Sequence, residues 1–180
     1  MIPRHLEQFL IQNGAAQSAH SGSTLWCHLV GVHQILDAIG AQRYLREAGL
    51  FHSVYGTNSF KKKTVSRDER SQIRNLIGDK SEELVWIFCT IRKASLLERA
   101  LAGCGATWLD QIESPRSKVD ILDDLLSMEC ANLLEQRNLY HFTHLSRKAR
   151  GLGMLDGEGF SIQFACLSSE ANQLENIHVN

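Results

Sequence analysis

The spacing of apolar residues constrains the fold of this chain most, because they recur every three or four positions and no long stretch alternates apolar and polar residues. A period near 3.6 residues is typical of amphipathic helices, whereas alternation is typical of half-buried strands. Only two prolines could interrupt such helices, Pro3 and Pro115. The sequence therefore predicts an all-α fold, a bundle of about seven or eight helices.

The length of 180 residues predicts one helical domain over residues 1–180, because single domains commonly contain about 100–200 residues. The longest predicted helix begins at Ser114-Pro115, because serine is a common N-cap residue and proline is favoured at the first helical position. The C-terminal tail, residues 151–180, is less regular. The clearest helices are predicted over residues 24–39, 43–53 and 116–137.

Composition limits the kinds of partner. The 19 Lys and Arg residues are balanced by 20 Asp and Glu residues, so the chain lacks the basic excess of a nucleic-acid-coating protein. It has no run of about 18 apolar residues and no signal-peptide pattern at its start, so we expect no membrane segment. The five cysteines are widely spaced without a CxxC motif, which favours free thiols in a reducing compartment. We therefore expect a cytoplasmic protein that binds neither nucleic acid nor membrane.

Three polar side chains occupy core-facing positions on three predicted helices: His28, His52 and Asn132. Burying such groups without partners costs about 1–3 kcal/mol each. We therefore expect them to meet one another, water or a metal in a shared pocket. Each belongs to a stripe on its own helix whose successive members lie three or four positions apart. The apolar members of these stripes are Val32, Ile35 and Ile39; Leu45 and Ala48; and Ile121, Leu125 and Met128.

Four segments resemble the RelA/SpoT-type hydrolase branch of the HD superfamily. Residues 21–32 (SGSTLWCHLVGV) resemble its Ser-Gly turn and the metal-binding histidine that begins a helix. Residues 48–57 (AGLFHSVYGT) resemble its His-Asp-x-x-Glu-Asp-Thr signature, residues 73–90 the segment that follows, and residues 129–134 (ECANLL) its Ala-Asp-x-Leu run. The whole string also looks like a bacterial family with the pattern HSG…H…FHSVYGT. The resemblance covers about residues 18–137 and implies an HD-like helical bundle.

The departures from that branch fall on its chemistry. His28 and His52 match its two metal-binding histidines, but Ser53 and Asn132 replace its two aspartates. Tyr-Gly at residues 55–56 replaces the Glu-Asp pair that assists attack by water. Mg²⁺ and Mn²⁺ gain most from carboxylate ligands. We therefore expect a pocket without negative charge that binds neither ion well.

Several functions remain open. In the first, a metal-free small-molecule enzyme uses His28 and His52 as general acid and base, with Tyr55 supplying a hydroxyl. In the second, a soft transition metal, Zn²⁺ or Fe²⁺, is held by His28 and His52. The resemblance implies a third, metal-dependent hydrolysis of nucleotides or alarmones, and the lost carboxylates suggest a fourth, an inactive binding module.

Further side chains are expected around the substrate. His20 lies in the turn before the predicted helix 24–39 and is expected at the rim of the pocket. The resemblance implies that residues of the matched Ser-Gly turn and of the two matched signatures also contact the substrate. Together the expected substrate-binding residues are His20, Ser21, Ser53, Thr57 and Asn132.

Overall fold

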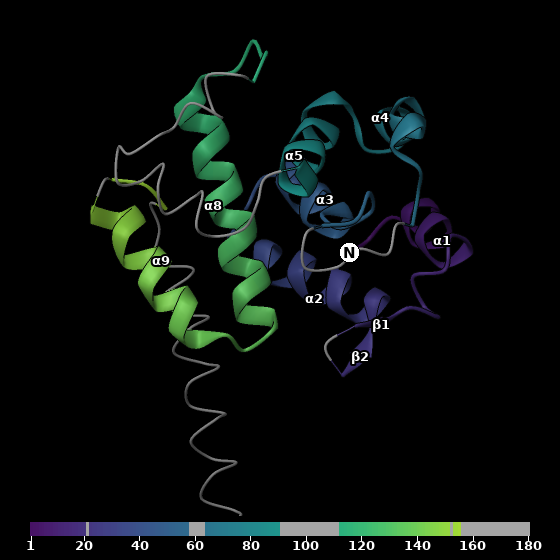
Figure 1. Ribbon diagram of the computed structural model, residues 1–180, viewed down its shortest axis with the longest axis horizontal. Coiled ribbons are helices and arrows are strands. Elements are labelled where there is room, and N and C mark those ends of the chain that lie inside the picture. The colour runs from purple at the N-terminus through teal and green to yellow at the C-terminus, as the bar shows by residue number, and fades with distance from the viewer. Residues whose placement is uncertain (21, 58–63, 91–111, 152, 156–180) are drawn as a thin grey trace, which may run out of the picture.

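The computed structural model describes residues 1–20, 22–57, 64–90, 112–151 and 153–155. Within these ranges the regular structure is helical except for one small hairpin, which confirms the all-α class (Figure 1). Most of the predicted C-terminal tail lies outside the described residues. The elements are α1 (Arg4–Gln12), β1 (Ala19–His20), β2 (Ser23–Thr24), α2 (Leu25–Ala38), α3 (Arg43–Phe51), the 3₁₀ helix η1 (Arg67–Glu69), α4 (Arg70–Ile77), α5 (Asp79–Thr90), α8 (Lys118–Glu135) and α9 (Leu139–Gly151).

Side-chain caps fix the start of the two helices that matter most for the site. The Thr24 hydroxyl accepts a hydrogen bond from the Cys27 backbone N–H at the start of α2. Ser117 caps α8 in the same way by accepting from Asp120 N–H. The long helix therefore starts after Ser117, slightly later than the Ser114-Pro115 signal predicted, because the Ser114 hydroxyl is used in a preceding turn by Arg116 N–H.

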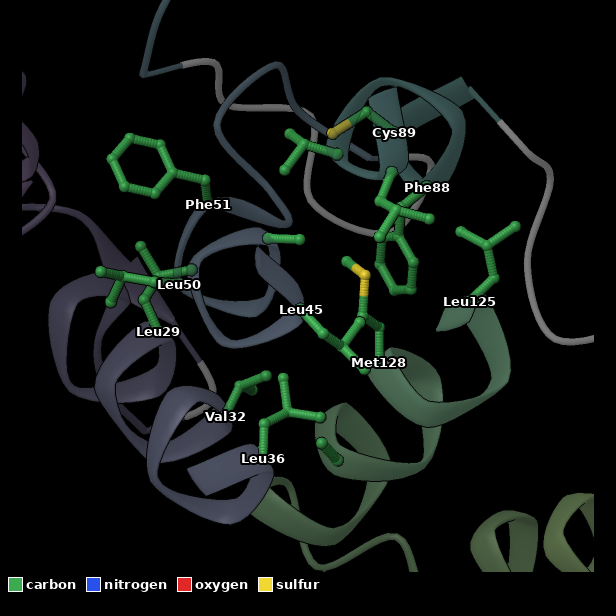
Figure 2. Packing of buried hydrophobic residues seen from close by; sticks show 14 of the residues in the cluster. Leu29, Val32, Leu36, Leu45, Leu50, Phe51, Phe88, Cys89, Leu125 and Met128 are labelled. Carbon is green, nitrogen blue, oxygen red and sulfur yellow. The ribbon is translucent and has the colours of Figure 1, made fainter. Parts of the chain in front are cut away.

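Helix α2 lies at the centre of the core and packs against α3 on one side and α8 on the other. Figure 2 shows side chains of α2, α3, α5 and α8 that belong to one apolar cluster. This burial is the main driving force for the fold. It also brings together the helices that carry the three polar residues singled out in the sequence. Buried members of this cluster include Leu29, Val32, Leu36, Leu45, Leu50, Phe88, Leu125 and Met128.

A glycine lets α2 and α3 approach closely. A Cβ on residue 49 would lie only 2.3 Å from Cδ1 of Leu36 and 3.3 Å from Cγ1 of Val32. A side chain there would force Leu36 to move, so glycine lets the backbone of α3 lie close against α2. This contact sets the depth at which the end of α3, and with it His52, sits beside α2.

Among the described helices, none has both the length and the apolar character needed to cross a bilayer.

Candidate active site

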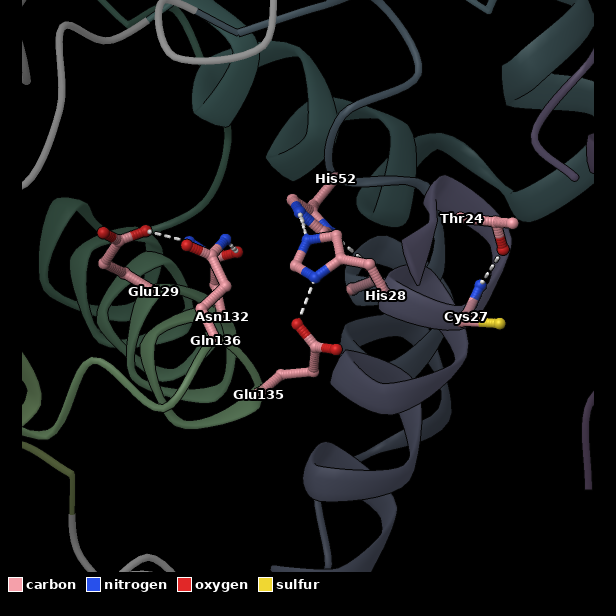
Figure 3. A network of polar contacts seen from close by, with 9 residues as sticks. Thr24, Cys27, His28, His52, Glu129, Asn132, Glu135 and Gln136 are labelled. Atoms are coloured by element: carbon pink, nitrogen blue, oxygen red, sulfur yellow. Dashed lines mark hydrogen bonds and ion pairs between the residues drawn. The ribbon is translucent and has the colours of Figure 1, made fainter. Parts of the chain in front are cut away.

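Two imidazoles from different helices meet inside the bundle. His28 lies one turn into α2, and His52 directly follows the last residue of α3. Their exposed fractions are 2% and 3%. The two Nε2 atoms are 3.1 Å apart, which is a hydrogen-bonding distance (Figure 3). The structure thus brings together the two histidines that the helical spacing placed on core-facing stripes.

Hydrogen-bond partners define where the protons of this pair lie. Nδ1 of His52 is 2.7 Å from the carbonyl oxygen of Gly49, and a carbonyl only accepts, so Nδ1 carries the hydrogen. Burial, reinforced by the nearby His28, lowers the pKa of His52 to about 3. His52 is therefore neutral near pH 7, with a bare Nε2. Nε2–H of His28 is consequently the donor across the 3.1 Å contact.

A carboxylate that the sequence reasoning missed completes the chain of contacts. Glu135, the last residue of α8, pairs through Oε2 with Nδ1 of His28. Since Nε2 of His28 already donates, one further proton must lie between Nδ1 and the carboxylate. The pair is either imidazolium and carboxylate or neutral imidazole and carboxylic acid. The expected pocket residues therefore lacked one acidic side chain, Glu135, which the structure places against His28.

A signal for Glu135 was present in the sequence. The stripe on α8 that was followed from Ile121 to Asn132 continues, three residues further on, to Glu135. The resemblance instead indicates position 132 for the acidic group of the site. Helical geometry places residues three apart on the same side of a helix. In the structure, the acidic group of the site therefore lies about one turn further along α8 than position 132.

A third imidazole covers this pair. His20 lies on the β1–β2 hairpin, where it pairs with Ser23 and where Gly22 has a φ of +81°. Its ring stacks on His28 with centroids 4.1 Å apart and an interplanar angle of 17°. Burial, and then the charge of His28, lowers the pKa of His20, with partial opposition from Glu135. His20 is half-buried and the Glu135 side chain is 23% exposed, so these two form the outer edge of the cluster.

Asn132 faces its own helix. Its Oδ1 accepts from Nε2 of Gln136 at 2.9 Å, and its Nδ2 donates to Oε2 of Glu129 at 3.2 Å (Figure 3). Both ends of the carboxamide are thus occupied within α8, and no described hydrogen bond joins it to a histidine. Burial raises the pKa of Glu129 to about 7. The carboxamide supports Glu129 rather than the imidazole pair.

Tyr55 takes a different place from the one expected. Its side chain is completely buried, and its hydroxyl donates to Oε1 of Glu82 at 3.0 Å. Glu82 is also fully buried and accepts from Arg70 at 2.7 and 2.8 Å and from Arg74 at 3.0 Å. Burial opposes ionisation of Glu82, but the arginine bonds prevail and lower its pKa. The hydroxyl of Tyr55 therefore serves this ionic network between α4 and α5.

The remaining expected substrate-binding residues are placed unevenly. Ser53 is 2% exposed, and its hydroxyl has no hydrogen-bond partner within the described ranges. Thr57 is half-buried and follows Gly56, which has a φ of +74°. Ser21 lies outside the described residues. Of these expected residues, the structure therefore places His20 with the two buried histidines, and Ser53 directly follows His52 in the sequence.

The donor set does not fit a metal centre. The two Nε2 atoms could serve as two ligands of one ion, but catalytic zinc sites usually provide three protein ligands. In the part of the chain that the structure describes, no group of three His, Cys, Asp or Glu side chains is arranged to hold a metal. The described residues therefore do not offer a complete ligand set for zinc or iron.

A cavity of about 500 Å³ lies on α9 and shares no residue with the histidine cluster. Its lining residues are Leu139, Tyr140, Thr143, His144 and Arg147.

Comparison with known proteins adds one match. Residues 9–93 match a family described as a domain of unknown function, DUF6817. This segment contains the three clustered histidines but ends before α8, so it excludes Glu135. No curated protein and no solved structure matches the chain.

Proposed function

We propose that this chain is an enzyme that performs acid–base chemistry on a small polar metabolite. The observation that carries the proposal is the continuous line of contacts from Glu135 through His28 and His52 to the Gly49 carbonyl. A carboxylate that orients a histidine is the common arrangement by which enzymes hold a proton ready for transfer. Burying these polar groups is costly unless each is hydrogen-bonded, and every ring nitrogen in the line has a partner.

The geometry favours proton exchange at the outer end of the line. All four ring nitrogens of His28 and His52 are engaged inside the protein. Glu135 and His20 are the members that retain exposure. In this proposal a substrate meets Glu135 and the His20 ring, and the proton held between Glu135 and His28 is the one transferred. His52 keeps His28 in the correct orientation.

The helical arrangement is consistent with the HD-like fold that the sequence resemblance implies, and we propose that fold as the scaffold. What supports this proposal is that the three residues matched to the motif, His28, His52 and Asn132, lie on α2, at the end of α3 and on α8. The chemistry would differ from that of the family, because the acidic member here orients a histidine instead of binding a metal.

An activity screen with matched variants tests this function. The full chain is assayed on phosphate esters, nucleotides, carboxylic esters and amides, each with a chelator and with Zn²⁺ or Mn²⁺ added. We expect turnover that survives the chelator and falls about 10²-fold or more in His28→Gln. The exposed His141, changed to Gln, provides a control that should retain full activity.

Activity that is unchanged in His28→Gln would contradict the proposed site. Two other results would each support a different function. Turnover that requires added metal would favour the metal-dependent nucleotide hydrolase. The inactive binding module is favoured by one observation, the near-complete burial of His28 and His52. It would be supported if a metabolite raised the unfolding temperature but was recovered unchanged.

A further inference from the structure

Glycine at position 31 lies in the interior of α2, where glycine is a poor helix former. Gly31 is not among the described glycines with positive φ, so its backbone conformation does not require glycine. Any advantage of glycine at this position must therefore come from the space that a side chain would fill.

That space is occupied by Glu135. A Cβ on residue 31 would lie 2.6 Å from Cγ of Glu135 and 3.3 Å from both its Cδ and Oε1. Contacts below 3.0 Å force a shift. Cγ lies near the root of the side chain, so Glu135 could relieve the contact only by moving its carboxylate away from His28.

We propose that Gly31 is a positioning residue for the site. By carrying no side chain it lets Glu135 cross the surface of α2 and reach Nδ1 of His28. The inference rests on the proposed function, because it supplies the reason for bringing the carboxylate there. Gly31 acts entirely through Glu135, so its role can be tested without a known substrate.

The experiment is a double-mutant cycle read by NMR and by thermal unfolding on the full chain. Gly31→Ala is compared with wild type, and Gly31→Ala/Glu135→Ala with Glu135→Ala. In wild type, the imidazole N–H shared by His28 and Glu135 should give a far-downfield proton resonance, which Glu135→Ala assigns by its loss. Gly151 provides the control, since a Cβ there would meet nothing within 4 Å.

We expect Gly31→Ala to lose this resonance and to lower the unfolding temperature, whereas Gly151→Ala does neither. In the Glu135→Ala background the same substitution should leave the unfolding temperature unchanged or raise it, because alanine favours the helix. A wild-type resonance in Gly31→Ala, or an equal drop in unfolding temperature in both backgrounds, would overturn the inference.

Two further outcomes are also decisive. If Gly31→Ala does not fold, a folded Gly31→Ala/Glu135→Ala supports the inference and an unfolded one overturns it. If exchange with water hides the resonance, the two unfolding differences decide. Neither reading depends on turnover, so a failed activity screen would count against the proposed function and leave the role of Gly31 standing.

Discussion

Nε2 of His28 and Nε2 of His52 lie 3.1 Å apart, and only one of them can carry the hydrogen that joins them. The Gly49 carbonyl, 2.7 Å from Nδ1 of His52, decides which one it is. His52 uses its hydrogen on that carbonyl, so His28 must donate to His52 and must turn its other nitrogen to Glu135. A backbone oxygen on α3 thus orders the protons of a line that ends on α8.

The first prediction concerns the protonation of His52. We expect its ring to remain neutral between pH 5 and 8, in the Nδ1–H form, because burial is the main cause that lowers its pKa to about 3. Two-dimensional ¹⁵N NMR of the imidazoles distinguishes the two neutral forms and the cation. A His52 ring that titrates near the ordinary histidine value of about 6.5 would contradict the hydrogen-bond order described above.

The second prediction concerns the charge on Glu135. Glu135→Gln can keep a hydrogen bond to Nδ1 of His28 but cannot exchange the proton, so we expect activity to fall about 10²-fold. The free energy of unfolding should fall by about 1–2 kcal/mol, since the proton shared by Glu135 and His28 is replaced by an ordinary amide hydrogen bond. The activity is measured on the substrate found by the screen, and the free energy of unfolding is measured by urea unfolding.

The matched control for this change is Glu83→Gln. The Glu83 side chain is also 23% exposed, and its nearest ionic partner, Arg116, is 3.8 Å away. We expect it to retain activity. Equal losses in the two variants would show that the effect of Glu135→Gln is not specific to the site.

Much of the fold was predictable because helical periodicity is a local property. The predicted ranges 24–39 and 43–53 became Leu25–Ala38 and Arg43–Phe51. The site was less predictable, because it depends on how closely helices approach. The clearance that Gly31 gives to Glu135 is a relation between α2 and α8, and no spacing within one helix reveals it.

Tyr55 shows a second limit of reasoning from the sequence. Helix α3 ends at Phe51, so the direction of the side chains after it is set by turns and not by helical periodicity. The Gly56 N–H closes one such turn on the Ser53 carbonyl at 2.8 Å. The Tyr55 hydroxyl reaches Glu82 as a result, although the matched motif placed it with the catalytic groups.

The third prediction follows from this placement. Tyr55→Phe should retain activity, because the hydroxyl serves Glu82 and its arginines. The free energy of unfolding should fall by about 1–2 kcal/mol, since one of the bonds to a buried carboxylate is lost. Parallel urea unfolding and activity assays test both parts. Loss of activity with unchanged stability would restore Tyr55 to the catalytic group.

The fourth prediction uses the pH dependence of stability. Burial raises the pKa of Glu129 to about 7, above its ordinary value near 4.5. Between these values the folded state binds more protons than the unfolded state, so this group makes stability fall as pH rises from about 4.5 to about 7. Glu129→Gln removes that penalty and retains an oxygen that can accept from Nδ2 of Asn132.

We therefore expect Glu129→Gln to be about as stable as wild type at pH 4 and more stable at pH 8. Because Glu129 keeps partial exposure, the gain should be about 1 kcal/mol, less than the full shift would give. Urea unfolding at four pH values between 4 and 8 measures the difference. A gain that is equal at all four values would place its cause in packing, and a loss at pH 8 would show that the carboxylate is stabilised as the anion.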